Sequence, residues 1–226
     1  MSDRPSGFTA VMAGRQPSED RLDYFPTPPW AARAGGELIR RLDPEARTCW
    51  EPAAGEGHMV HGLRDYFEDV VGSDIVDRGG GFPVQDFLDP RSPVAPGADW
   101  IVTNPPFSLA EAFARTAFAQ ARRGVALLCR LQFLESALRH DLFYGSLRLG
   151  VVAPFAERVA MVKGRYDPAA STATAYAWFI WSKRHPAGAP IIMPLGPGAR
   201  ARLTRPDDAR RFGVATDTPL FAEGGE

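Results

Sequence analysis

Short apolar runs that end at polar or proline-rich residues recur along the chain. The clearest are Thr48–Trp50, Asp69–Ile75, Trp100–Val102, Gly124–Leu131 and Tyr176–Trp181. These runs are short, largely uncharged and contain β-branched or aromatic residues, so the pattern predicts buried strands.

Stretches with helical spacing of apolar residues lie between these strands. Leu109–Arg122 and Gln132–Tyr144 both predict amphipathic helices. Shorter runs predict further strands at Phe82–Asp89, Arg148–Ala153 and Ile191–Met193. The alternation predicts an α/β domain over residues 21–185. We expect residues 1–20 to be a mobile arm and residues 186–226 to be an irregular tail, because both are polar or rich in Pro and Gly.

The strand at Trp100–Val102 stops at Asn104-Pro105-Pro106-Phe107. Proline donates no ladder hydrogen bond, so the strand must end there, and Pro105 restricts Asn104 to extended conformations. Ligands bind at the carboxyl ends of strands in open α/β sheets. The sequence NPPF is therefore either a binding corner or a simple proline-rich turn, and by itself it does not decide between them.

A glycine loop follows the strand at Thr48–Trp50. Glu51 ends the strand, Gly55 and Gly57 form the loop, and a helix with Met59 and Leu63 on its inner side follows. Such a turn lets the backbone approach a ligand. Val60 stands where a dinucleotide fingerprint has its third glycine, so that fingerprint is incomplete. An acid at the end of the strand, Glu51, suits a ligand with a positive amino group better than a pyrophosphate. His58 and His61 have no third ligand nearby, so we expect them to be solvated and no metal to bind.

Two acidic residues follow further strands. Asp74 lies about 20 residues past the glycine loop, the offset at which a carboxylate binds ribose hydroxyls. Asp86 can accept a hydrogen bond from an exocyclic amine, and Phe87 can pack on a ring; a solvated acid beside a core Phe is an equally good interpretation.

Proline, aromatic and basic residues mark two more stretches. In Asp23–Trp30 (DYFPTPPW), Thr27 can cap a helix whose first turn contains two prolines; the alternative is a staple that holds the N-terminus on the core. Arg158, Lys163, Arg165 and Tyr166 form a basic and aromatic cluster, which suits phosphates and bases or is an ordinary charged hairpin.

Composition sets few limits on function. The 226 residues are 45% hydrophobic, which allows one sizeable core, and 26 basic against 27 acidic residues give a net charge of −1. Any nucleic-acid surface must therefore be local. Cys49 and Cys129 lie in apolar runs, the N-terminus does not resemble a signal peptide, and no run is long enough to span a bilayer. We expect a cytoplasmic protein without a membrane partner.

Together these motifs resemble the S-adenosylmethionine-dependent amino-methyltransferases, most closely the small phage-type DNA N6-adenine methyltransferases. The resemblance covers about residues 22–182, with TPPW, EPAAGEG, Asp74, QDF, NPPF and the late aromatic strand in gamma-type order. It implies a Rossmann-like methyltransferase fold, with a mostly parallel seven-stranded sheet and an antiparallel late strand. It also implies S-adenosylmethionine as cofactor and methylation of adenine N6 in DNA.

The resemblance implies a role for each matching residue. The catalytic corner would be Asn104, Pro105, Pro106 and Phe107. The cofactor would be bound by Thr27, Glu51, Pro52, Ala53, Gly55, Gly57, Asp74, Ile75, Asp86 and Phe87. The DNA substrate would be bound by Tyr176 or Tyr166 as a second aromatic, and by Arg158, Lys163 and Arg165.

Two alternative functions and the means of substrate recognition stay open at this point. The acceptor could be cytosine N4, an RNA base or a protein glutamine, since similar corners occur in those groups. A cofactor- or DNA-binding module without turnover is a different class. The tail is too short for a separate recognition domain, so recognition would be loose, confined to residues 158–175 and the tail, or shared with a partner or second copy.

Overall fold

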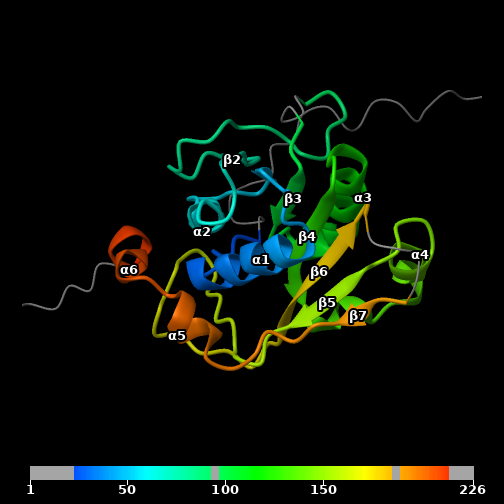
Figure 1. The fold of residues 1–226 in the computed structure, drawn as a ribbon. Coiled ribbons are helices and arrows are strands. Elements are labelled where there is room, and N and C mark those ends of the chain that lie inside the picture. Colours follow the sequence, from blue (N-terminus) through cyan, green and yellow to red (C-terminus); the bar gives the residue numbers. More distant parts are fainter. Residues whose placement is uncertain (1–22, 93–96, 185–188, 214–226) are drawn as a thin grey trace, which may run out of the picture.

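One mixed sheet with helices on both faces forms the core of the protein (Figure 1). The computed structural model describes residues 23–92, 97–184 and 189–213. Within them the strands are β1 (Thr48–Glu51), β2 (Asp69–Gly72), β3 (Trp100–Thr103), β4 (Gly124–Arg130), β5 (Val151–Pro154), β6 (Tyr176–Ser182) and β7 (Ile191–Ile192). The α-helices are α1 (Pro29–Leu42), α2 (His58–Leu63), α3 (Ala110–Gln120), α4 (His140–Tyr144), α5 (Ala199–Leu203) and α6 (Pro206–Phe212). Short 3-10 helices are η2 (Phe107–Leu109), η3 (Leu131–Leu134) and η4 (Ala137–Arg139).

The strand order is β2-β1-β3-β4-β6-β5-β7. β2, β1, β3 and β4 are parallel, and β6 is antiparallel to both β4 and β5. The predicted sheet with seven strands and an antiparallel late strand is therefore confirmed for the described residues. The carboxyl ends of β2, β1, β3 and β4 share one edge, which is where the predicted site residues follow their strands.

Alternate strand residues pack on opposite faces of the sheet. Trp100 and Val102 face the cluster formed with α1, α2 and α5, whereas Ile101 faces the cluster formed with α3 and α4. In β6, Trp178 and Phe179 divide in the same way. A sheet buried on both faces requires apolar residues at consecutive positions, which explains the uninterrupted apolar runs.

Several predicted elements differ from those observed. The predicted third strand at Phe82–Asp89 was wrong: only Val84 pairs, in an isolated parallel bridge with Asp74, because Pro83 cannot extend the ladder. The predicted helix Gln132–Tyr144 is two 3-10 turns followed by α4, since the Ser136 side chain accepts from Leu138 N and starts a new turn. Residues 158–167 form no extended hairpin; their isolated bridges are Val162–Arg165 and Tyr166–Gly213.

The predicted tail is not irregular throughout. Residues 199–212 form α5 and α6, and Arg33 of α1 binds both carboxylate oxygens of Asp208, at 2.7 and 2.8 Å. Both side chains are 1% exposed. A buried pair between residues 175 positions apart has no local signature, so periodicity could not predict it. The predicted arm at 1–20 and the last residues of the tail lie outside the described residues.

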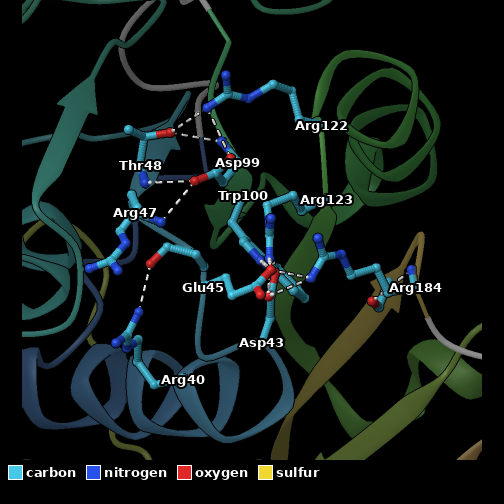
Figure 2. A network of polar contacts seen from close by, with 12 residues as sticks. Arg40, Asp43, Glu45, Arg47, Thr48, Asp99, Trp100, Arg122, Arg123 and Arg184 are labelled. Atoms are coloured by element: carbon cyan, nitrogen blue, oxygen red, sulfur yellow. Dashed lines mark hydrogen bonds and ion pairs between the residues drawn. The ribbon is translucent and has the colours of Figure 1, made fainter.

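A polar network closes the sheet edge opposite to the site (Figure 2). Asp43, at the end of α1, accepts hydrogen bonds from Trp100 Nε1 at 2.9 Å and Arg123 Nε at 2.7 Å. The Arg123 guanidinium holds the pKa of Asp43 below its usual range. Asp99 accepts from the backbone N–H of Thr48 at 3.2 Å. The network ties α1 to the starts of β1, β3 and β4, which is a structural role.

No helix among the described residues is both long and apolar enough to cross a bilayer. Cys49 and Cys129 are free and buried, and burial raises the pKa of both thiols.

Candidate active site

A pocket opens at the carboxyl ends of β1, β2 and β3; we call it the central pocket. The space between its walls is about 680 Å³, part of which is open solvent. The predicted site residues that line it are Thr27, Glu51, Pro52, Ala53, Asp74, Ile75, Phe87, Asn104 and Pro106. Residues from Asp23 to Thr27, before α1, form one wall. The sheet therefore brings distant motifs of the sequence into one cavity.

Asn104, the only asparagine in the chain, follows β3 with its amide held in one orientation. Its Nδ2 donates to the Phe25 carbonyl oxygen at 3.0 Å and to Met161 Sδ at 3.5 Å. Because only nitrogen can donate to a carbonyl, Oδ1 must point the other way. Oδ1 is buried and has no hydrogen-bond partner among the described residues. The corner thus presents one fixed, unused acceptor.

The other corner residues differ in their burial. Pro105 is buried, whereas Pro106 and Phe107 are partly exposed. The Phe107 ring does not line the central pocket; it lies 5.3 Å from the Phe25 ring, and the Arg130 guanidinium lies 3.9 Å from its centroid. Phe107 is therefore at the rim of the site.

Glu51 is 1% exposed at the end of β1. Its Oε1 accepts from Ala53 N at 3.1 Å, and its Oε2 is buried without a hydrogen-bond partner among the described residues. Burial raises the pKa of this carboxyl to about 8. A cation placed beside Oε2 would favour the ionised form, so the carboxyl is suited to an ammonium group.

The glycine loop and Asp74 are joined directly. Gly55 N donates to Asp74 Oδ2 at 2.7 Å, and Val76 N donates to Oδ1 at 3.1 Å. Gly55 has φ +55°, and a Cβ there would lie 2.5 Å from the Tyr24 ring. A side chain at this position is excluded by both the backbone conformation and the ring. Gly57, with φ +94°, is the residue before α2 and does not line the central pocket.

The segment before α1 is a wall of the pocket, and sequence reasoning gave it too small a role. Tyr24 O accepts from Gly164 N at 2.9 Å, its hydroxyl accepts from Glu56 N at 3.3 Å, and Arg78 lies over its ring at 4.2 Å. Thr27 is buried and lines the pocket, but it does not cap α1; the N-cap is Pro28, without a side-chain hydrogen bond. The aromatic residues of DYFPTPPW were the signal for this wall.

Asp86 lies outside the pocket although it was predicted to bind the cofactor. It is exposed, and its side chain accepts from Leu88 N at 2.9 Å, which closes a local turn. Phe87 is 4% exposed and packs its ring between Trp50 and Phe113, with one side on the pocket. The turn thus positions Phe87 rather than presenting Asp86.

The predicted substrate residues do not line the central pocket either. Arg158, Lys163 and Arg165 are exposed, and Arg165 lies 3.6 Å from Asp167. Tyr166 is 5% exposed and packs against the His58 ring, and Tyr176 is 4% exposed in β6. None of these residues lines the pocket, so their role stays a prediction.

The prediction that His58 is solvated was wrong. His58 is 2% exposed, stacks on the Phe212 ring at 4.1 Å, and lines the central pocket. Burial lowers its pKa to about 4, so it is neutral at pH 7. His61 Nε2 lies 3.6 Å from Asp208 Oδ1, and with Asp207 it forms a cluster of the metal-binding kind. Because both oxygens of Asp208 bind a guanidinium, this cluster stabilises α6 and does not suit a metal.

No protein-family model and no curated protein matches the sequence. Solved structures do match in fold. The methyltransferase subunit of a type I restriction-modification system from Streptococcus thermophilus is 14% identical, with a TM-score of 0.54 over 74% of this chain and 46% of its own length. A candidate RNA methyltransferase from Pyrococcus horikoshii is 16% identical, with a TM-score of 0.53 over 75% of this chain and 92% of its own. The chain has the Rossmann-like fold of S-adenosylmethionine-dependent methyltransferases.

Proposed function

We propose that this protein transfers a methyl group from S-adenosylmethionine to the exocyclic N6 amine of adenine in DNA. The observation that carries the proposal is the Asn104 side chain beside the central pocket, whose buried Oδ1 lacks a hydrogen-bond partner within the described part of the chain. Buried polar atoms are normally paired, so an unpaired acceptor in a cavity indicates a ligand that donates. An amine N–H is such a donor.

The central pocket fits the cofactor on the chemistry of its donors. Glu51 Oε2 is an unpartnered buried carboxyl oxygen that an ammonium would satisfy. Asp74 oxygens keep lone pairs for ribose hydroxyls after binding the loop, since a carboxylate offers about four acceptor sites. Phe87 and Ile75 supply apolar surface for the adenine ring. When bound, the cofactor supplies an electrophilic methyl group.

The role of Asn104 follows from the chemistry of an aromatic amine. The amine is a poor nucleophile, because its lone pair is delocalised into the ring. Asn104 Oδ1 would accept from one N–H, and the Pro105 carbonyl from the other. Both acceptors favour tetrahedral nitrogen and stabilise the positive charge that grows as the N–C bond forms and the C–S bond breaks. The methylated, positively charged nitrogen would then release one proton to solvent water, which restores a neutral amine.

The acceptor base would reach this corner only outside the DNA stack. Phe107, at the rim, would stack on the base, and Tyr176 is the candidate for a second aromatic. The exposed Arg158, Lys163 and Arg165 suit the DNA backbone. Adenine in DNA is proposed because TPPW together with NPPF resembles the DNA N6-adenine enzymes; the other acceptors are outcomes of the test.

The test compares wild-type protein with Asn104→Ala. The protein is incubated with methyl-labelled S-adenosylmethionine and, separately, with DNA, RNA and protein acceptors. We expect label in DNA, and a loss of about 100- to 1,000-fold in rate for Asn104→Ala, with cofactor affinity by calorimetry unchanged.

The matched control is Gln120→Ala. Gln120 Oε1 is also a buried amide oxygen without a partner among the described residues, but it lies on α3, outside the central pocket. This variant should keep wild-type transfer. Equal loss of transfer and cofactor binding in Asn104→Ala would contradict the role given to Asn104, and label only in RNA or protein would contradict the proposed acceptor.

A further inference from the structure

Arg130 is an exposed cation at the site that no carboxylate neutralises. It ends β4, next to the end of β3, and none of the ion pairs found among the described residues includes it. Its guanidinium lies over the Phe107 ring, 3.9 Å from the centroid. By contrast, Arg122 and Arg123, at the opposite edge of the sheet, pair with Asp99 and Asp43. Within the described part of the chain, Arg130 therefore has no anionic partner and can bind an anion from another molecule.

The Arg130 guanidinium lies over the Phe107 ring, where a base stacked on that ring would lie. A guanidinium is planar and packs on aromatic faces, as a nucleobase does. It covers a face of Phe107, the ring that stacks on the acceptor base under the proposed function, on which this inference rests. Tyr176 is the direct partner of Arg130 across the β4–β6 ladder, so both side chains leave the sheet on the same face. A base cannot stack on the covered face until Arg130 moves.

We infer that Arg130 is a DNA-binding residue that exchanges one partner for another. Without DNA, its guanidinium covers Phe107. When the acceptor base stacks on Phe107, the displaced guanidinium binds a backbone phosphate of the strand that carries the base. Arginine suits this exchange, since its planar fork binds phosphate through two hydrogen bonds and its contact with an exposed ring is weak.

The test measures the affinity of the full chain for a fluorescently labelled DNA duplex over a series of salt concentrations. Affinity falls as salt rises, and each phosphate contact makes the plot of log affinity against log salt steeper by about 0.9; the slope is given below as its magnitude. Arg130→Ala should lower the slope by about 0.9 and weaken binding at low salt by roughly tenfold or more. Arg130→Lys should keep the slope, because the charge remains.

Arg47→Ala is the matched control. Arg47 lies just before β1, at the opposite edge of the sheet, and its exposed guanidinium pairs with Glu68. This variant should keep the wild-type slope. In methyl transfer, Arg130→Ala should raise KM for DNA by about tenfold and change kcat by less than about threefold, since Asn104 and Phe107 are intact.

The inference is overturned by a wild-type slope in Arg130→Ala, by equal changes in Arg130→Ala and Arg47→Ala, or by a slope in Arg130→Lys as low as in Arg130→Ala. A failure of the proposed function is distinguishable. If the wild-type protein transfers methyl groups only to RNA or protein, the proposed function fails; if it methylates DNA and the slopes are equal, only the role of Arg130 fails.

Discussion

Replacing Glu51 with glutamine removes a carboxyl group that the folded chain holds largely protonated at neutral pH. The side chain is 1% exposed, its Oε1 accepts from Ala53 N, and burial raises the pKa to about 8. Ionisation therefore places a charge at a position with little exposure to water. Glutamine keeps the shape of the protonated carboxyl and cannot ionise.

The sign and size of the effect follow from the two pKa values. The pKa is about 4.5 in the unfolded chain and about 8 in the folded one. Between these values the folded state holds the proton more tightly, so the free energy of unfolding of the wild type falls as pH rises. At about 1.4 kcal/mol per pH unit, the whole fall due to Glu51 is about 4 to 5 kcal/mol. It is complete above about pH 8.

The assay is urea unfolding of wild type and Glu51→Gln, without cofactor, at pH values from about 4 to about 9. As pH rises over this range, the free energy of unfolding of Glu51→Gln should increase by about 4 kcal/mol relative to that of the wild type. Other groups such as His58 titrate equally in both proteins and cancel. Glu56→Gln, at an exposed position of the same loop, should show no such trend. Parallel pH curves for wild type and Glu51→Gln would refute the reasoning.

Two further substitutions test the packing around the site. Asp208→Asn leaves the buried Arg33 without its bidentate partner, so the free energy of unfolding measured with urea should fall by about 3 to 5 kcal/mol. The control is Asp207→Asn, whose side chain on α6 is 40% exposed; it should change the free energy of unfolding by less than about 0.5 kcal/mol. An equal effect of both would contradict the burial argument. Gly55→Ala adds a Cβ 2.5 Å from the Tyr24 ring and should weaken cofactor binding, measured by calorimetry, by tenfold or more. Gly79→Ala has a similar positive φ but open space, and should bind normally; equal losses would mean that backbone strain alone is responsible.

Much of the site could be predicted because its residues follow strands directly. Glu51, Asp74 and Asn104 come at or just after the ends of β1, β2 and β3, and parallel strands bring their carboxyl ends to one edge. Apolar runs and prolines therefore located both the strands and the corner. The same rule could not place Asp86, since only the isolated bridge at Val84 precedes it and a local turn begins at Asp86 itself.

The remaining parts depend on contacts between distant segments. Met161 and the Phe25 carbonyl fix the Asn104 amide from 57 and 79 positions away. The stacking of His58 on Phe212 depends on α6, and α6 depends on the Arg33–Asp208 pair. No periodicity or turn signal records such contacts. A polar or charged residue in a loop reads as solvated until its partner is known.

The central claim is that Asn104 and its pocket methylate adenine N6 in DNA. The most direct measurement is the identity of the product nucleoside. DNA incubated with the protein and labelled S-adenosylmethionine is digested to nucleosides and analysed by mass spectrometry. We predict that the label is in N6-methyl-2′-deoxyadenosine, and that Asn104→Ala forms this product about 100- to 1,000-fold more slowly. Label in N4-methylcytosine, or no labelled nucleoside while the cofactor binds, would contradict the claim.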